Sequence, residues 1–394
     1  MTTQLPPRER SHARTERRSP DVLFEEARRR RRRRWTLGSL ALMIVLGSVA
    51  TVVSLNSSGA KRPAAAPSRS LAGALPDGRV VSLATAGPLA VAPDGALYVV
   101  DIARHRVLVR LRNGRFAVIA GNGRDGFSGD GGLATRAELS TITDIAFSPT
   151  GDLYIADGGR IRVVDHDGII RTIAGDGQPL PMVHRLFVAN IRPGTSALSA
   201  ALGSPRTVSY ESPMIAFSRR GQLYISTGVQ VLRLADNGTL TPVRAVVTSG
   251  PSILRGRLSG FGPLAIDDRG NVDISGFNGW SIWQITPSGV AHEIGPGSGA
   301  RRSGGGLSLL QRAPSGQVFG EDGSELLKID GRQLKPAQNF GNSFWLTYFA
   351  FGPHDSIYAD EIPGNAGFEA RQELLVSRRG HGTLLWEQPS KARH

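Results

Sequence analysis

One short phrase returns six times along this chain. In most copies it consists of an apolar run, a turn that contains glycine, an aromatic residue and a polar break. The copies lie at 90–101, 145–157, 215–227, 264–276, 310–322 and 349–360. A phrase that recurs in this way along a chain indicates a repeated supersecondary element. One such element cannot bury its apolar faces alone, so neighbouring elements must pack together to form a core. The sequence therefore predicts a repeat architecture.

The second copy shows the structure expected of one unit. Apolar runs at 145–147, 153–156, 161–164 and 169–174 are separated by turns that contain glycine, which predicts four short antiparallel strands. An aromatic residue follows the first turn in five copies, as Tyr98, Tyr154, Tyr224, Phe319 and Tyr358. The fourth copy has Asp273 at this position. Each unit is therefore expected to be a four-stranded β-meander.

Six such meanders predict an all-β fold, namely a six-bladed β-propeller with four-stranded antiparallel blades over residues 79–394. A closed ring requires the first and last blades to be joined. The apolar run 79–83 precedes the first copy, so we expect it to supply the outer strand of the last blade, beside 383–386. The chain has no cysteine, which excludes disulfides, thiolate metal sites and a cysteine nucleophile.

Three stretches carry a resemblance to a known family. DIAFSPTGDLYIAD at 144–157, RIRVVDHDG at 160–168 and the glycine-rich AGNGRDGFSGDGGLATRAEL at 120–139 resemble NHL-repeat β-propellers of the bacterial membrane-anchored type. The resemblance is specific over roughly 88–175 and weakens from the third copy onward. It implies a six-bladed propeller that is used mostly as a binding platform, although a minority of such propellers are enzymes.

The N-terminal part has a different composition. Residues 1–34 hold 12 arginines and 5 acidic residues, so much of the net charge of +14 lies there. Residues 35–55 form an uncharged apolar stretch, long enough to cross a bilayer as a helix, and seven arginines precede it directly. Arginines stay on the cytoplasmic side, so 1–34 is expected to be a basic cytoplasmic tail and 35–55 a single transmembrane helix. Nucleic acid is a disfavoured partner, because the excess charge lies outside the repeats.

The expected location follows from this orientation. Residues 56–78, rich in Ala, Pro, Ser and Gly, are expected to form a flexible linker, and the propeller is expected to lie outside the cell membrane. The alternative is a signal peptide cleaved near 58–60, which would give a secreted protein. The apolar stretch is longer than the core of an ordinary signal peptide, which favours the membrane anchor.

The loops suggest where a ligand binds. Two connectors between blades, 121–141 and 175–212, are unusually long, and they share one propeller face with charged loops after the second strands of blades 1 and 2. The candidate binding residues on this face are Asp101, Arg104, His105, Arg124, Asp125, Asp130, Asp157 and Arg160. The alternative is structural: Asp101 and Asp157 cap strand ends beside arginines, and the glycines of 121–132 supply positive φ angles.

Few patterns point to catalysis. The chain has no G-x-S-x-G sequence and its histidines show no metal-binding spacing, so we predict no catalytic residues, no metal ligands and no cofactor. Ca²⁺ or another divalent metal held by Asp125 and Asp130 is a weaker alternative, since the EF-hand pattern is missing. The sequence thus predicts a membrane-anchored, extracytoplasmic module that binds a protein, peptide or envelope polysaccharide. The alternative function is a propeller hydrolase or lyase with a metal in its central channel.

Overall fold

The computed structural model describes residues in the second of the two units into which the chain divides, Ala65–His394. The described residues are 80–183, 186–187, 191–203, 212–247, 262–275, 282–296, 309–321, 325–339, 344–353, 356–363, 373–378 and 381–387. The predicted tail at 1–34, transmembrane helix at 35–55 and linker at 56–78 lie outside these ranges. Within them, no helix has both the length and the apolar character needed to cross a membrane.

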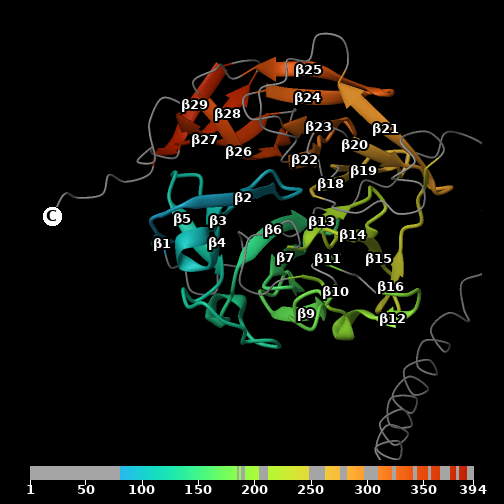
Figure 1. Cartoon of the computed structure of the whole chain (residues 1–394). Coiled ribbons are helices and arrows are strands. Elements are labelled where there is room, and N and C mark those ends of the chain that lie inside the picture. Colours follow the sequence, from blue (N-terminus) through green and yellow to red (C-terminus); the bar gives the residue numbers. More distant parts are fainter. Residues whose placement is uncertain are drawn as a thin grey trace, which may run out of the picture. The chain divides into compact units, whose positions relative to one another are not determined.

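The described strands are arranged in meanders, each of four strands that pair antiparallel in chain order (Figure 1). The first meander contains β2 (Ala86–Val91), β3 (Leu97–Asp101), β4 (Arg106–Arg110) and β5 (Phe116–Ala120). The second contains β6 (Ile142–Phe147), β7 (Leu153–Asp157), β8 (Arg160–Val164) and β9 (Ile170–Ala174). The third contains β13 (Met214–Phe217), β14 (Leu223–Ser226), β15 (Val231–Leu234) and β16 (Thr239–Pro242). These strands follow the apolar runs of the sequence, and the all-β prediction is confirmed.

The C-terminal half continues the pattern. The fourth meander contains β18 (Leu264–Ile266), β19 (Val272–Ser275), β20 (Ile282–Ile285) and β21 (Val290–Pro296). The fifth contains β22 (Leu309–Arg312), β23 (Val318–Glu321), β24 (Glu325–Asp330) and β25 (Gln333–Asn339). The last contains β26 (Phe344–Phe351), β27 (Ile357–Pro363), β28 (Glu373–Arg378) and β29 (His381–Glu387). A parallel pairing of β21 with β25 joins the fourth and fifth meanders at their outer edges.

The first strands of the meanders form a closed ring. β2 packs against β6, β6 against β13, β13 against β18, β18 against β22, β22 against β26 and β26 against β2. Each of these strands is the end strand of its sheet, so the sheets radiate outward from the ring, as Figure 1 shows. This arrangement is that of a β-propeller.

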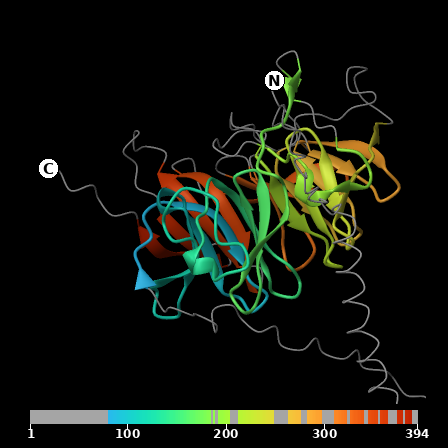
Figure 2. The same cartoon turned by 90° about the horizontal axis from the view of Figure 1, so that it is seen from below.

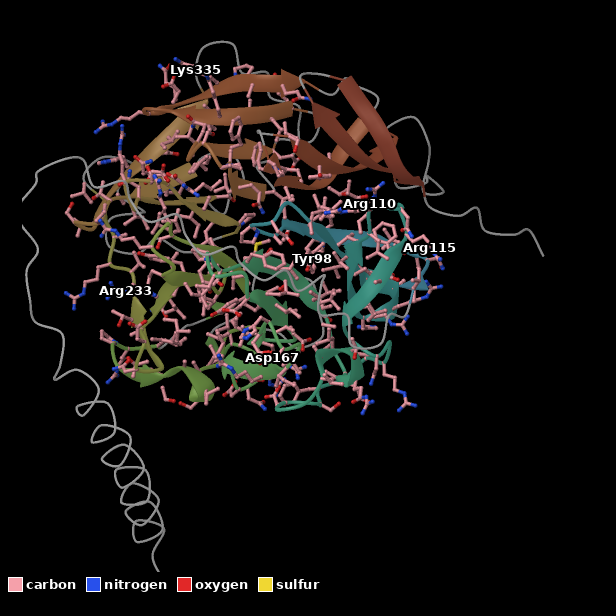
Figure 3. All side chains as sticks on the ribbon, turned by 180° about the vertical axis from the view of Figure 1, so that it is seen from behind. Tyr98, Arg110, Arg115, Asp167, Arg233 and Lys335 are labelled. Atoms are coloured by element: carbon pink, nitrogen blue, oxygen red, sulfur yellow. The ribbon has the colours of Figure 1, made fainter. Side chains whose placement is uncertain are left out.

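Apolar side chains between adjacent meanders form the core. The repeated aromatic residues pack across these interfaces, and Tyr98 lies edge-on against Phe147 with ring centroids 4.7 Å apart. Tyr154 and Phe217 repeat the same contact between the second and third meanders. Figure 3 shows Tyr98 inside the sheets and Arg115 and Arg233 at the periphery. The aromatic residue of the repeat therefore packs one meander against the next. Each aromatic pair stabilises the fold by about 0.5–1.5 kcal/mol beyond the effect of the area it buries.

Short strands extend the outer edges of three meanders. β1 (Val80–Val81) pairs with β5, and β12 (Thr195–Ser196) pairs with β16. A single bridge from Leu133 to Ile169 occupies the same place beside β9. β17 (Val246–Val247) instead pairs parallel with β21, and β10 (Met182–Val183) with β11 (Leu186–Phe187) forms a separate hairpin that projects from the sheets in Figure 2.

The pairing of β1 corrects one prediction. The run 79–83 was expected to complete the last meander, but Val80 and Val81 pair with β5 of the first meander, and β29 pairs with β28. Leu83, which follows β1, is fully buried in an apolar cluster that joins Leu97 and Leu108 of the first meander to Ala350 of the last. Among the described residues, packing between β2 and β26 closes the ring, with no strand exchanged between first and last meanders.

Candidate functional site

The meander topology gives the ring two faces. Because consecutive strands run in opposite directions, the turns between first and second strands lie at one end, which we call the turn face. The loops between second and third strands and the connectors to the next meander lie at the other end, the connector face. Contacts support this division, since His105 Nδ1 in the loop after β3 lies 2.8 Å from the carbonyl oxygen of Ser140 in the following connector. All predicted binding residues belong to the connector face.

Arg162 is the centre of the charged cluster on this face. It extends from β8, is fully buried, and its Nη2 donates to Asp130 Oδ1 at 2.7 Å and to the carbonyl oxygen of Ser128 at 2.8 Å. Its Nη1 donates to Asp157 Oδ2 at 3.3 Å and to the carbonyl oxygen of Glu138 at 2.9 Å. One guanidinium thus holds the middle of the glycine-rich connector, and its later part at Glu138, against β7 and β8.

The carboxylates around Arg162 differ in their electrostatics. Burial raises the pKa of Asp157 to about 6, although hydrogen bonds from Ser140 and Arg162 and the charge of Arg162 act to lower it. Burial also acts on Asp130, but hydrogen bonds from Thr172 and Arg162 outweigh it and lower the pKa below its ordinary value. Both oxygens of Asp130 accept hydrogen bonds within the protein, one from Arg162 and one from the backbone N–H of Thr172 at 3.0 Å.

Phe127 is the exposed aromatic residue of this cluster. The guanidinium of Arg160 lies 3.8 Å from the ring centroid and that of Arg162 lies 4.9 Å from it, while 44 % of the residue is exposed. Arg160 also donates to the carbonyl oxygen of Asp176 at 2.9 Å, so it links the first long connector to the second. The aromatic ring is thus supported by cations and still open to solvent.

Asp101 and Arg104 form a second group, beside the first meander. Asp101 is fully buried, and its carboxylate accepts hydrogen bonds from the backbone N–H groups of Ala84 and Thr85, each at 3.4 Å. Burial raises the pKa of this carboxyl. Arg104 lies 3.6 Å from Asp101 and donates to the carbonyl oxygen of Ser82 at 3.0 Å. These contacts attach the segment before β2 to the end of β3.

The remaining predicted residues lie between these groups. His105 adopts a left-handed backbone conformation with φ of 48°, at the end of the 3₁₀ turn η2 (Ile102–Arg104). Its Nδ1 lies 4.0 Å from Asp125, whose side chain is 63 % exposed. Arg124 is exposed, and its backbone N–H donates to the side chain of Asn122. The structure therefore brings Asp130, Asp157 and Arg160 together around Arg162, and leaves Arg124 and Asp125 open to solvent.

The connectors repeat one local structure. Gly121 N–H donates to the carbonyl oxygen of Ala134 at the start of η3 (Ala134–Arg136), and Gly175 N–H donates to Ala197 at the start of η4 (Ala197–Ser199). Gly121 has φ of +90°, and a Cβ there would lie 2.2 Å from the carbonyl oxygen of His105. Only glycine permits this approach, which brings the connector against the preceding loop.

The sequence predictions missed two residues of the cluster, Arg162 and Phe127. A signal for Arg162 exists, because the equivalent positions of the first and third meanders hold Leu108 and Leu232. An arginine at an apolar position of a repeat indicates a buried polar contact. Phe127 has no counterpart in a regular strand, and a large aromatic residue within a glycine-rich loop is the corresponding signal. Among the described residues, no three histidine, aspartate or glutamate side chains are placed to share a metal ion.

Comparisons with known proteins agree with the sequence resemblance. The family model of the teneurin NHL domain matches residues 117–192, which hold the glycine-rich connector and the second meander. Teneurin-m of Drosophila melanogaster is 36 % identical over 103 residues, covering 22 % of this chain and 4 % of that protein. Teneurin-1 of Caenorhabditis elegans is 32 % identical over 128 residues, covering 27 % and 5 %. This chain thus spans a small part of these relatives.

Solved structures of similar arrangement include lyases and lactonases. Virginiamycin B lyase from Staphylococcus aureus has a TM-score of 0.47 at 11 % identity, with 80 % of this chain and 89 % of that one covered. A gluconolactonase from Xanthomonas campestris has a TM-score of 0.45 at 14 % identity, with 73 % and 88 % covered. The family match over 117–192 and the arrangement of the meanders together support an NHL-type propeller. The membrane-anchored bacterial type stays a prediction.

Proposed function

We propose that residues 79–394 form a six-bladed NHL-type propeller, each meander being one blade, that serves as a protein-interaction module. The partner protein binds the connector face around Phe127. The family match supports an interaction role of this general kind, since it covers the connector and the meander that hold the Arg162 cluster. The residues of the cluster carry the more specific proposal.

The exposed ring of Phe127 is the observation on which the binding site rests. Aromatic residues are frequent among those that dominate binding energy, because they offer a large contact area at a small cost in conformational entropy. Phe127 combines 44 % exposure with support from Arg160, and Arg162 anchors the flanking backbone at Ser128. A loop held in this way loses little freedom when a partner covers it. Such preorganisation favours tight and specific association.

A photo-crosslinking experiment tests the site. A benzophenone amino acid replaces Phe127 in the full-length chain, and a second protein carries it at Leu198, which is 57 % exposed in η4 of the following connector. We expect a discrete crosslinked protein from position 127 and a much weaker product from 198. Equal products from both positions would contradict the site. A crosslinked partner that remains large after the propeller has been digested with protease would indicate a polysaccharide rather than a protein.

Matched substitutions quantify the contribution. Phe127→Ser should reduce capture of the crosslinked protein at least about tenfold, the effect of losing a residue worth more than 1.4 kcal/mol. Leu198→Ser removes a similarly exposed apolar side chain from the equivalent connector and should leave capture within about twofold. The proposal fails if the two substitutions have the same effect.

We also propose that a single helix at 35–55 anchors the chain, with 1–34 in the cytoplasm and the propeller outside. The seven arginines before the apolar stretch support this orientation. Protease added to intact cells should remove an epitope tag at the C-terminus and spare one at the N-terminus. Protection of both tags would overturn the orientation, and recovery of the propeller in the medium without the N-terminal tag would favour secretion after cleavage.

A further inference from the structure

A central channel runs through the ring of first strands. Its volume is about 500 Å³, within the range of small-molecule sites, and all of the first strands contribute to its wall. Five equivalent positions at mid-height hold alanine, namely Ala90, Ala146, Ala216, Ala265 and Ala350, and the fifth meander has Gln311 there. The small side chains keep this part of the channel open.

The two ends of the channel differ in chemistry. Toward the connector face, the wall contains Met214, Leu309 and Pro263 together with Asp144, which is the only acidic residue among the described residues of the lining. Tyr348 packs with Met214 against the apolar cluster that contains Leu309. The end at the turn face carries instead the basic side chains of Arg219 and Arg312. The connector end is thus an apolar ring with one carboxylate.

Asp144 is held in a defined position. One carboxylate oxygen accepts from its neighbour Ile145 N–H at 2.9 Å, and the other accepts from Ile215 N–H of β13 at 2.8 Å. Each oxygen keeps a further lone pair. Within the described residues, no arginine, lysine or histidine forms an ion pair with Asp144, and its side chain is partly accessible although protein surrounds it. The part of the chain that the structure describes thus gives this carboxylate no positively charged partner.

The protein around Asp144 disfavours an ionised carboxylate that has no counter-ion. Burial raises the pKa of Asp144 to about 7, even though both backbone hydrogen bonds lower it. Burial likewise raises the pKa of Tyr348 to about 12, with the charges of Asp360 and Asp144 acting in the same direction, so its phenol is neutral at physiological pH. A cation bound beside Asp144 would restore favourable electrostatics in a region of low dielectric constant.

We propose that the channel binds a small organic cation, an ammonium or guanidinium group on an apolar stem, with the charged group at Asp144. Met214, Leu309 and Pro263 provide the apolar wall for the stem. A hard metal ion fits less well, because Ca²⁺ needs six or more oxygen ligands and the described lining of this end offers one carboxylate. The site is independent of the partner surface around Phe127.

Matched probes test the charge preference. Butylamine, butanol and butyrate share one alkyl stem, and saturation-transfer NMR with the full-length protein at pH 8.5 detects weak binding of each. We expect a saturable signal from butylamine, and affinities at least about tenfold lower for butanol and butyrate, since only the ammonium complements the carboxylate. Equal binding of butylamine and butanol, or no binding of butylamine, would overturn the proposal.

Two variants locate the site. Asp144→Asn should abolish the preference for butylamine over butanol. Asp273→Asn serves as the control, because the pKa of Asp273 is likewise raised to about 7, but its carboxyl is fully buried and does not line the channel. This control should bind butylamine as the unmodified protein does. An unchanged preference in Asp144→Asn would contradict the assignment.

The pH dependence of the unmodified protein gives a test that needs no variant. Butylamine remains protonated from pH 5.5 to 8.5, whereas a carboxyl with a pKa of about 7 changes from mostly neutral to mostly ionised. The affinity should therefore rise by about 30-fold over this range. Binding that is independent of pH would overturn the proposal even if Asp144→Asn failed to fold.

Discussion

The two faces of the ring hold their charged residues in different ways. On the connector face, Arg162 and Asp157 are 0 % and 1 % exposed, and the arginine also bonds Asp130 and two backbone carbonyl groups. On the turn face, Arg219 pairs with Asp268 at 3.3 Å, with side chains that are 66 % and 35 % exposed. The Arg162–Asp157 pair is shielded from water, whereas the Arg219–Asp268 pair remains in contact with it.

The backbone explains why the faces differ. A turn on the turn face satisfies its own polar groups, as Gly151 N–H donates to Ser148 and Ser148 N–H donates to Asp152. The connector 121–141 pairs some carbonyl groups with backbone N–H groups, such as that of Ala134 with Gly121, but the carbonyl groups of Ser128 and Glu138 accept hydrogen bonds from Arg162. In this connector, a buried arginine therefore supplies hydrogen bonds that the turns of the other face form within their own backbone. The predictions below test this difference.

The largest effect is expected from Arg162→Leu, which installs the residue found at the equivalent positions of the first and third meanders. The change leaves Asp157, Asp130 and two carbonyl groups without their buried donor, and it should lower the free energy of unfolding by about 3–5 kcal/mol. Guanidinium denaturation measures the loss, and limited proteolysis should show cleavage within 121–139. Arg115→Leu, at an exposed turn, is the control and should change the free energy by less than about 0.5 kcal/mol. Similar losses for both variants would refute the role of Arg162.

Two glycines of similar backbone conformation compare the faces directly. Gly121 lies on the connector face, and Gly114 lies in the turn between β4 and β5, which alternation of strand direction places on the turn face. Their φ angles are +90° and +82°. A Cβ at Gly121 would lie 2.2 Å from a backbone oxygen, whereas at Gly114 its nearest neighbour is 3.7 Å away. Gly114→Ala should cost about 1 kcal/mol for the backbone conformation alone, and Gly121→Ala about 3 kcal/mol. Equal losses in denaturation would mean that the connector can move away without penalty.

The pH dependence of Arg162→Leu is a smaller effect. Burial raises the pKa of Asp157 to about 6, whereas the pKa of an aspartate in an unfolded chain is about 4. The folded state therefore keeps the proton up to a higher pH than the unfolded state. The stability that this group contributes falls as the pH rises from about 4 to 6. Removing Arg162 raises this pKa further and extends the fall to higher pH. The destabilisation by Arg162→Leu should therefore be about 1–2 kcal/mol larger at pH 8 than at pH 5.

A double variant checks the origin of that dependence. Asp157→Asn removes the titrating group, so in the combined variant the difference between pH 8 and pH 5 should shrink by at least half. If the difference persists unchanged, another carboxyl causes it, and the buried pair is not the source.

The amino-acid sequence was sufficient to predict the strands, but not to predict the cluster around Arg162. Strand positions follow from local patterns, and the aromatic position of the repeat identifies Tyr98 and Tyr154 as packing residues before their partners are known. The partner strand of 80–81 was predicted wrongly, because its pairing with β5 is a tertiary contact that the local pattern of the run does not encode. Local patterns determine strands, whereas the choice of partner strand depends on packing.

The site shows the same limit. The loop lengths and charges led to Asp130, Asp157 and Arg160, all of which contact the cluster. They gave no indication that Arg162 joins them, since it lies on β8 and its partners are 24 to 34 residues away on the connector. Comparison of each repeat position with its counterparts would have revealed it. A departure from the repeat is more informative than a charged residue in a loop, where charge is common.

The smallest effect is expected on the turn face. Arg219→Ala removes an exposed ion pair, and Asp268 keeps its contact with Arg312. The free energy of unfolding should therefore fall by less than about 0.5 kcal/mol. This loss should vanish in about 1 M salt, which screens exposed charges. Parallel denaturation of this variant and Arg162→Leu at low and high salt provides the comparison. The loss in Arg162→Leu should persist in salt, because a fully buried guanidinium is shielded from ions. A salt-sensitive loss in both variants would mean that water reaches the connector cluster, and the contrast between the faces would no longer hold.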